Sequence, residues 1–246
     1  MEIRLFNYQE PRLFSSYGRT YDVEMVAKAR AREIIRDLRS GSGATSTTLS
    51  STYVDDRAQL HCDKWIEETS FHISRYSAAK KIADKPRLST PTTRASTPPE
   101  AQRLIIQYKS FSGDVSGVIG EAIFSCLLVQ QFDLQDKDFA HFRADKLSGI
   151  FPDFGIFLLS AALETRLNWD GRGLRGPVIP AEVKTVTSAN TGDIRYKLIK
   201  AIQQVQNFWV RINGGALTQD GESGVICLAV RNQDRGAYDI ALIWGR

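Results

Sequence analysis

The spacing of apolar residues separates this chain into two parts with different organisation. In the first part, apolar residues recur every three or four positions over 22–39 and 55–84, which predicts two helices. A stretch rich in Ser, Thr and Pro follows at 86–100, and its composition is typical of a flexible connection. We therefore expect a mainly helical N-terminal segment over 1–85, a linker over 86–100 and a second domain over 101–246.

The second domain is expected to mix helices with strands. An apolar helix is predicted over 115–131 and an amphipathic helix over 193–212. Runs rich in β-branched and aromatic residues predict strands at 150–159, 178–186, 225–231 and 238–244. The order helix, strand, strand, helix, strand, strand indicates an α/β fold with a central mixed β-sheet flanked by helices.

Composition narrows the class of protein. The 246 residues are 42% hydrophobic and 24% charged, and no apolar run approaches the roughly 18 to 20 residues that a membrane span needs. The first residues lack the features of a secretory signal. We expect a soluble, cytoplasmic protein that makes no contact with a membrane.

The cysteines and histidines do not have the spacing of a zinc site. Cys62, Cys126 and Cys227 lie far apart, and no two of the histidines are separated by the four positions that suit a metal on a helix. Any metal is therefore expected to be a hard cation bound by oxygen atoms. The net charge of +4 permits a nucleic-acid partner but does not by itself indicate one.

Charged residues occur inside two of the predicted strands. In the segment VIPAEVKTV, the two-residue period of a strand places Glu182 and Lys184 on the same face of an otherwise apolar strand. Asp153 follows Pro152 at the head of another apolar strand. Burying such charges is costly unless they pair with one another or bind a metal. Two interpretations stay open, a buried ion pair with Asp153 as a strand cap, or a metal-dependent catalytic site.

Two short motifs resemble those of the PD-(D/E)XK nuclease superfamily, which includes restriction endonucleases and nucleases of repair and recombination. The first motif is Pro152-Asp153 and the second, further along the chain, is Glu182-Val183-Lys184. The resemblance covers about residues 117–244. It implies a restriction-endonuclease-like core in which Asp153 and Glu182 bind Mg²⁺, with Mn²⁺ able to substitute, and Lys184 is catalytic. Such a site suits phosphodiester hydrolysis, because the cation polarises the phosphate and activates a water molecule.

Two further residues match positions that this family often uses. Glu121 lies on the apolar helix before the first motif, where the resemblance implies a further metal ligand and catalytic residue. A glutamate favoured near a helix N-terminus is the alternative. Gln204, on the helix after the second motif, begins the segment QVQNF, which is similar to the family's Q-x-x-x-Y form with Phe208 in place of tyrosine. A solvated polar face explains Gln204 and the neighbouring Lys200 equally, and Lys200 is otherwise a candidate contact for nucleic acid.

Other basic residues are also candidates for contact with nucleic acid. Lys28, Arg32 and Arg36 recur at every fourth position and so share one side of the first predicted helix. They form either a stripe that contacts phosphates or a solvated helix face. Arg172 and Arg175 lie in a glycine-rich connection between the two motif strands, where they either meet a phosphate backbone or solubilise a hairpin.

Together these features predict a Mg²⁺-dependent nuclease that hydrolyses phosphodiester bonds of DNA, of the restriction or defence endonuclease type, with RNA left open as a substrate. The N-terminal segment would add substrate contact or dimerisation. The alternatives are a repair or recombination nuclease, and a catalytically silent nucleic-acid-binding or assembly subunit that retains the fold. A homodimer, or a partner subunit that supplies specificity, is compatible with each of them.

Overall fold

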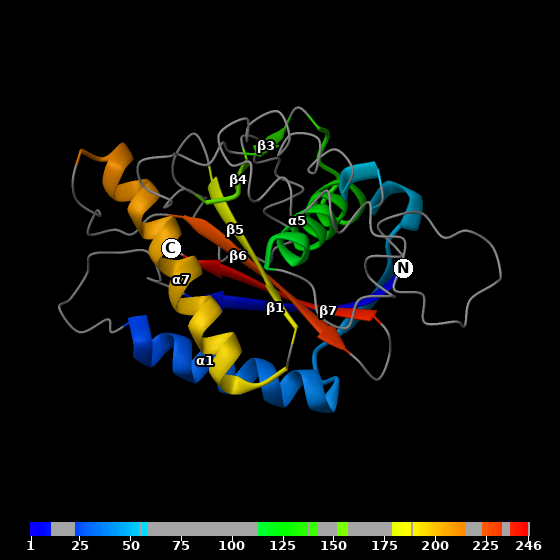
Figure 1. The fold of residues 1–246 in the computed structure, drawn as a ribbon, viewed down its shortest axis with the longest axis horizontal. Coiled ribbons are helices and arrows are strands. Elements are labelled where there is room, and N and C mark those ends of the chain that lie inside the picture. The colour runs from blue at the N-terminus through cyan, green and yellow to red at the C-terminus, as the bar shows by residue number, and fades with distance from the viewer. Residues whose placement is uncertain are drawn as a thin grey trace.

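A mixed β-sheet forms the centre of the molecule (Figure 1). The computed structural model describes residues 1–10, 23–54, 56–58, 113–136, 138–141, 152–156, 179–187, 189–214, 223–232 and 237–245. Within these residues the sheet has seven strands in the order β2-β1-β7-β6-β5-β4-β3. The strands are β1 (Glu2–Glu10), β2 (Thr45–Thr48), β3 (Phe139–His141), β4 (Phe154–Ile156), β5 (Ile179–Val186), β6 (Gly224–Asn232) and β7 (Ala237–Gly245). β5 runs parallel to β6 and β1 parallel to β7, whereas the other neighbours are antiparallel.

Helices cover both faces of this sheet. α1 (Val23–Ser40) and α7 (Thr191–Ile212) pack side by side on one face, where they share an apolar core with β6 and β7. α5 (Gly113–Gln130) covers the opposite face over a second apolar core. The predicted α/β fold, with a mixed sheet between helices, is confirmed. In the part of the chain that the structure describes, no helix is long and apolar enough to cross a membrane.

Most predicted elements of the second domain lie close to their predicted positions. α5 and α7 correspond to the helices predicted at 115–131 and 193–212, and β5, β6 and β7 to three of the predicted strands. The strand predicted at 150–159 contains β4, which is three residues long. The sequence did not predict β3, because a strand of three residues is too short to show a period.

The N-terminal segment contributes strands to the sheet as well as a helix. α1 matches the helix predicted over 22–39, whereas most of the helix predicted over 55–84 lies outside the described residues. The expectation of a mainly helical segment missed β1 and β2. β1 pairs with β7 over eight positions, so the first residues of the chain belong to the same sheet as the second domain. The linker predicted at 86–100 is not among the described residues, and a boundary there stays a prediction.

A buried ion pair joins β1 to β7. Arg4 lies directly opposite Asp239 in the parallel pair, and Asp239 is buried. The Arg4 guanidinium donates from Nε to Oδ1 at 2.7 Å and from Nη2 to Oδ2 at 2.6 Å, and Asn232 donates to Oδ2 at 2.9 Å. A carboxylate tolerates burial when several donors satisfy it, so this contact fixes the register of the two strands.

Helix α7 is anchored at both ends. The side chain of Asn190 accepts a hydrogen bond from the N–H of Asp193 at 2.8 Å and so caps the first turn. Near the other end, Nε1 of Trp209 donates to the carbonyl of Ser223 at 2.8 Å, just before β6 begins. These contacts fix the position of the helix, which connects β5 to β6 along the chain.

Close packing of α5 on β5 depends on a glycine. An added Cβ atom at Gly120 would lie 2.4 Å from Oγ1 of Thr185 and 3.2 Å from Cγ1 of Val183. At Gly117, one turn earlier, the nearest neighbour of an added Cβ atom would be Oε1 of Glu121 at 3.9 Å, which is an ordinary contact. The missing side chain at Gly120 therefore lets the helix backbone approach the strand.

We predict that Gly120→Ala lowers the free energy of unfolding by about 1–3 kcal/mol, because the new methyl group overlaps Thr185. Gly117→Ala is the matched control. It adds the same methyl group to the same helix where there is space, and it should leave stability unchanged or raise it by up to about 1 kcal/mol. Urea unfolding followed by circular dichroism measures both variants. Equal stability of the two would contradict the close approach of α5 to β5.

Candidate functional site

The two charged residues of β5 point toward α7. Ala181 and Val183 pack in the core formed with α5, whereas Val186 packs in the core formed with α1 and α7. Successive side chains of a strand alternate between its faces, so Glu182 and Lys184 lie on the same side as Val186. The predicted placement of both charges on one face is confirmed.

Pairing of β4 with β5 brings Asp153 to Glu182. The antiparallel register sets Phe154 opposite Ala181, which places Asp153 at the level of Glu182. The backbone N–H of Asp153 donates to Oε2 of Glu182 at 3.1 Å, and the N–H of Val183 donates to Oδ2 of Asp153 at 2.9 Å. Two acidic residues that are distant in the sequence thus become neighbours at the head of β4.

The carboxylate of Glu182 is fully buried and has donors on both oxygens. Its exposed fraction is 0%, Nζ of Lys184 contacts Oε1, and the N–H of Asp153 bonds to Oε2. Each carboxylate oxygen has two lone-pair directions, so one direction on each oxygen is left for a further ligand. The Lys184 side chain keeps 19% of its surface exposed, whereas that of Glu182 keeps none.

The pKa of Asp153 is raised from its ordinary 3.8 to about 6, chiefly because burial removes water from around its carboxyl group. The negative charge of Glu121 acts in the same direction, while the positive charge of Lys184 and the hydrogen bond from Val183 oppose it. Asp153 nevertheless retains some exposed surface. A bound cation would favour the ionised carboxylate and offset the cost of its burial.

Burial also lowers the pKa of Lys184 below its ordinary value. The charge of Asp153 opposes this shift, and the positive charge of Lys197 on α7 adds to it. Near neutral pH, a larger fraction of Lys184 is therefore neutral than of a solvated lysine. Only the neutral amine can accept a proton.

The side chains around Asp153 that could hold a cation are carboxylates. Among the residues described, no group of three or more His, Cys, Asp or Glu side chains lies close enough together to hold a metal ion. Asp153 and Glu182 form a set of two, which fits Mg²⁺, because this ion commonly takes one or two carboxylates and completes its shell with water and substrate oxygens. Glu121 acts on Asp153 through its charge, and its role as a direct ligand stays a prediction.

Glu121 has a partner that the sequence did not indicate. It is 6% exposed on α5, and its Oε2 lies 3.0 Å from Nε2 of His141 on β3. His141 was absent from the predicted site because β3 is too short to show a period, and because no local spacing relates it to Glu121. Only the pairing of β3 with β4 brings it to this position.

Gln204 shares one side of α7 with Lys197 and Lys200. Lys197, Lys200 and Gln204 are separated by three, four and seven positions, so they share one side of the helix. The positive charge of Lys197 acts on the pKa of Lys184, so Lys197 lies within electrostatic range of β5. Lys200 is exposed and Gln204 is half-buried. Lys197 was not among the predicted site residues, although its helical spacing from Gln204 could have indicated it.

The basic stripe of α1 is exposed, as its spacing predicts. Lys28 and Arg32 are exposed, and the Arg36 side chain is 70% exposed. Arg36 also contacts Glu33 and Asp37 of the same helix. The exposure agrees with both a solvated face and a surface for phosphate contact, so the role of the stripe stays a prediction.

Some predicted residues lie outside the described part of the chain. Arg172 and Arg175 belong to this group, as does Cys62, and the contact of the two arginines with nucleic acid stays a prediction. Cys126 and Cys227 are described, buried and free of a disulfide, which agrees with their expected place in the core.

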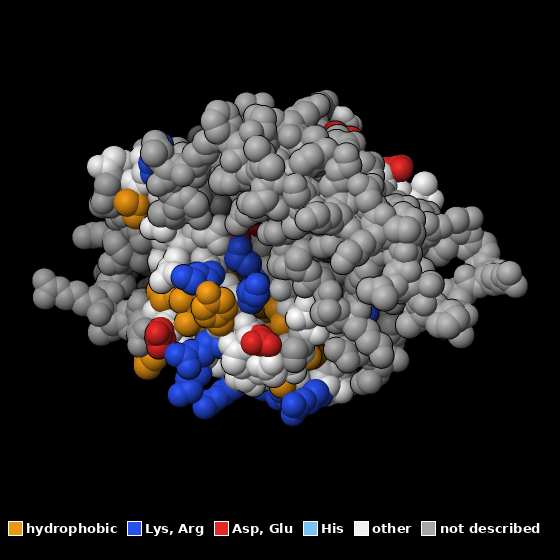
Figure 2. Space-filling model, in the orientation of Figure 1, with side chains coloured by type: hydrophobic (Ala, Val, Ile, Leu, Met, Phe, Trp, Pro, Cys, Tyr) orange, Lys and Arg blue, Asp and Glu red, His pale blue; other side chains and the backbone are white. Residues whose placement is uncertain are grey.

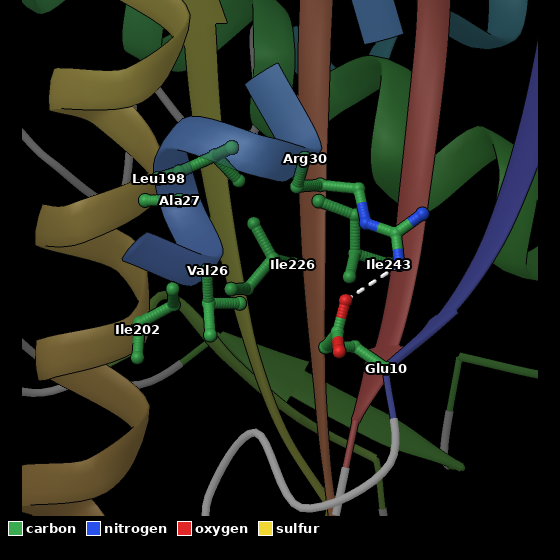
Figure 3. A pocket seen from close by; sticks show the side chains of 8 residues that line it. All are labelled: Glu10, Val26, Ala27, Arg30, Leu198, Ile202, Ile226 and Ile243. Carbon is green, nitrogen blue, oxygen red and sulfur yellow. Dashed lines mark hydrogen bonds and ion pairs between the residues drawn. The ribbon is translucent and has the colours of Figure 1, made fainter. Parts of the chain in front are cut away.

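A small cavity between α1, α7 and the sheet is separate from this site (Figure 3). Its volume is about 10 Å³, which is room for no more than about one water molecule. Apolar side chains of both helices, β6 and β7 line it, and an ion pair of 2.5 Å between Arg30 and Glu10 lies beside them. None of the predicted site residues lines this cavity, and we assign it to the packing of the helices on the sheet.

Comparisons with protein-family models, with curated proteins and with solved structures found no match to this chain. The function of the site is therefore inferred from its residues and their geometry, together with the motif resemblance.

The pKa of Asp153 predicts how the metal-free protein responds to pH. Because the folded-state pKa of about 6 exceeds the ordinary 3.8, the folded state binds more protons than the unfolded state between these values. Stability contributed by Asp153 is therefore lost as the pH rises from about 4 to about 6. Asp153→Asn should gain stability relative to the wild type as the pH rises through this range, and the difference should reach about 3 kcal/mol at neutral pH.

Urea unfolding in EDTA at a series of pH values measures this difference. Asparagine keeps an acceptor for the N–H of Val183, so the substitution tests the charge and not the hydrogen bond. A stability difference that stays constant across the range would show that Asp153 does not titrate there.

Proposed function

We propose that this chain is a Mg²⁺-dependent nuclease of the PD-(D/E)XK type with a restriction-endonuclease-like core, and that it hydrolyses phosphodiester bonds of DNA as an endonuclease of restriction or defence. The observation that carries the proposal is the contact of Asp153 with Glu182 across β4 and β5, with Lys184 against Glu182. Residues that the motif relates only by their order in the sequence are neighbours in space.

The order of the surrounding elements supports the same proposal. Glu121 lies on the helix before the first motif, Asp153 at the head of β4, and the second motif on β5. Gln204 lies on α7, directly after the second motif. The order of these elements along the chain is the order that the resemblance implies, which supports the proposal.

The chemistry follows from the charges of these groups. Asp153 and Glu182 would hold the cation through their oxygens, and Mg²⁺ bound there would polarise the phosphate and lower the pKa of an attacking water. Lys184 is placed to accept a proton from that water or to neutralise negative charge on the phosphate, and its lowered pKa favours the first role. The water oxygen would form a new bond to phosphorus while one P–O ester bond breaks, and the leaving sugar oxygen would take a proton from solvent.

The helical face of the molecule offers a route for the substrate. Figure 2 shows Lys and Arg side chains gathered over α1 and α7. Lys28, Arg32 and Arg36 of α1 and Lys200 of α7 are exposed, and the charged residues of β5 point to this same side of the sheet. Exposed cations on the catalytic side favour a phosphate backbone, because each contact releases counterions from the nucleic acid.

One observation favours the catalytically silent alternative. Both Glu182 oxygens already have donors inside the protein, as in an ordinary buried ion pair. The distinction between the two functions therefore depends on whether Asp153 and Lys184 serve a metal-dependent reaction, which a cleavage assay measures directly.

We predict that the purified protein cleaves DNA with Mg²⁺ or Mn²⁺ and not with EDTA, and that Asp153→Ala and Lys184→Ala each reduce the rate by about 100-fold or more, because each removes a group that acts on the transition state. Supercoiled, linear and single-stranded DNA, and RNA, are the substrates to compare. Glu24→Ala, purified in the same way, is the control, since Glu24 is exposed, pairs with Arg195 and is not one of the residues proposed to act in the site.

Cleavage that continues undiminished in the Asp153 and Lys184 variants would identify a contaminant and sink the proposal. Metal-independent binding of nucleic acid without cleavage of any substrate would favour the silent subunit instead. Cleavage of RNA alone would retain the mechanism and correct the substrate.

The stripe on α1 makes a separate prediction. If Lys28, Arg32 and Arg36 contact phosphates, changing all three to Gln should weaken binding to duplex DNA and reduce the slope of log K against log salt by up to about 3. The matched control exchanges Lys and Arg at these positions and so keeps the charges. Fluorescence anisotropy at several salt concentrations gives the slope. An unchanged slope would show that the three residues do not contact phosphates and form only a solvated helix face.

A further inference from the structure

The contact between Glu121 and His141 ties the edge of the sheet to α5. Nε2 of His141 and Oε2 of Glu121 lie 3.0 Å apart, and the two side chains are 10% and 8% exposed. The imidazole also packs edge-on against Phe154, with ring centroids 5.1 Å apart and an interplanar angle of 83°. The ring is therefore held in both position and orientation.

This contact lies next to the acid of the candidate site. In the pairing of β3 with β4, His141 lies directly opposite Phe154, which is the residue after Asp153. Both partners act on Asp153 electrostatically: the charge of Glu121 raises the pKa of Asp153, and the charge of His141 lowers it. The pair thus belongs to the same electrostatic group as the motif residues, although it lies on the α5 side of the sheet.

The direction of the hydrogen bond follows from the chemistry of the two groups. An ionised carboxylate can only accept, so Nε2 of His141 carries the proton and donates it toward Glu121. The neighbours of Glu121 along α5 include the buried apolar residues Ala122 and Phe124, and a carboxylate among apolar groups takes its orientation from its donors.

We propose that His141 is a positioning residue of the candidate site, which holds the Glu121 carboxylate toward Asp153 and thereby strengthens the binding of a divalent cation by Asp153 and Glu182. The inference rests on the proposed function, since it assumes that these two acids bind the cation. His141 acts through Glu121 and is not itself a ligand. Groups that orient the residues around a metal commonly change its affinity by about 10- to 100-fold when they are removed.

Binding of Mn²⁺ to the full chain, measured by titration calorimetry, tests the proposal without recourse to activity. His141→Ala should weaken Mn²⁺ binding by about 10- to 100-fold. His141→Gln keeps a side-chain N–H donor and should recover most of that affinity. If His141 acts through Glu121, then Glu121→Gln and the double variant with His141→Ala should bind Mn²⁺ equally weakly.

Three outcomes would overturn the inference. His141→Ala could bind Mn²⁺ as tightly as the wild type. His141→Ala and His141→Gln could show the same loss of Mn²⁺ affinity and the same fall in unfolding temperature, which would indicate a purely structural role. Finally, pulsed electron paramagnetic resonance of bound Mn²⁺ could show a nitrogen coupling that His141→Gln removes, which would make His141 a ligand.

Asp153→Ala separates failure of this inference from failure of the proposed function. If Asp153→Ala abolishes Mn²⁺ binding and His141→Ala leaves it intact, only the role of His141 is wrong. If Asp153→Ala binds Mn²⁺ as the wild type does, or the wild type binds none, the metal site itself is wrong and the role of His141 falls with it.

Discussion

The buried charge of Glu182 is the constraint on which the candidate site depends. This carboxylate is 0% exposed on a strand that has β4 on one side and β6 on the other, so it needs donors from within the protein. Lys184 supplies one donor from the same strand, and the N–H of Asp153 supplies another. The second donor is available only because β4 pairs with β5 in the observed register. The pairing that satisfies Glu182 therefore also delivers the second acid of the site.

Charged residues on both sides of the sheet act on the carboxyl group of Asp153. The charge of Lys184 acts on it from the α7 side, and the charges of Glu121 and His141 act on it from the α5 side. The close approach of α5 at Gly120 keeps Glu121 within electrostatic range. The affinity of Asp153 for a proton or a cation thus depends on how both helical layers pack against the sheet.

The N-terminal residues are part of this arrangement. β1 lies between β2 and β7, and the ion pair of Arg4 with Asp239 holds it there. Because α1 follows β1 and packs against α7, the basic stripe of α1 has a defined position on the side of the sheet that carries the second motif. The surface formed by α1 and α7 together is therefore larger than the surface of α7 alone.

The sequence by itself determined the features that depend on local spacing. A period of two placed Glu182 and Lys184 on one face of a strand, spacings of three and four located α1 and α7, and a nearly continuous apolar run located α5. Only the tertiary structure decided which strands pair and in what register, and with them the contacts of Asp153 with Glu182 and of Glu121 with His141. β1 escaped prediction for a related reason: Leu5 and Phe6 are both buried, on opposite faces of the sheet, so the strand lacks a simple alternation. A local pattern records which way a side chain points relative to its own backbone, whereas pairing depends on residues that the chain brings together from a distance.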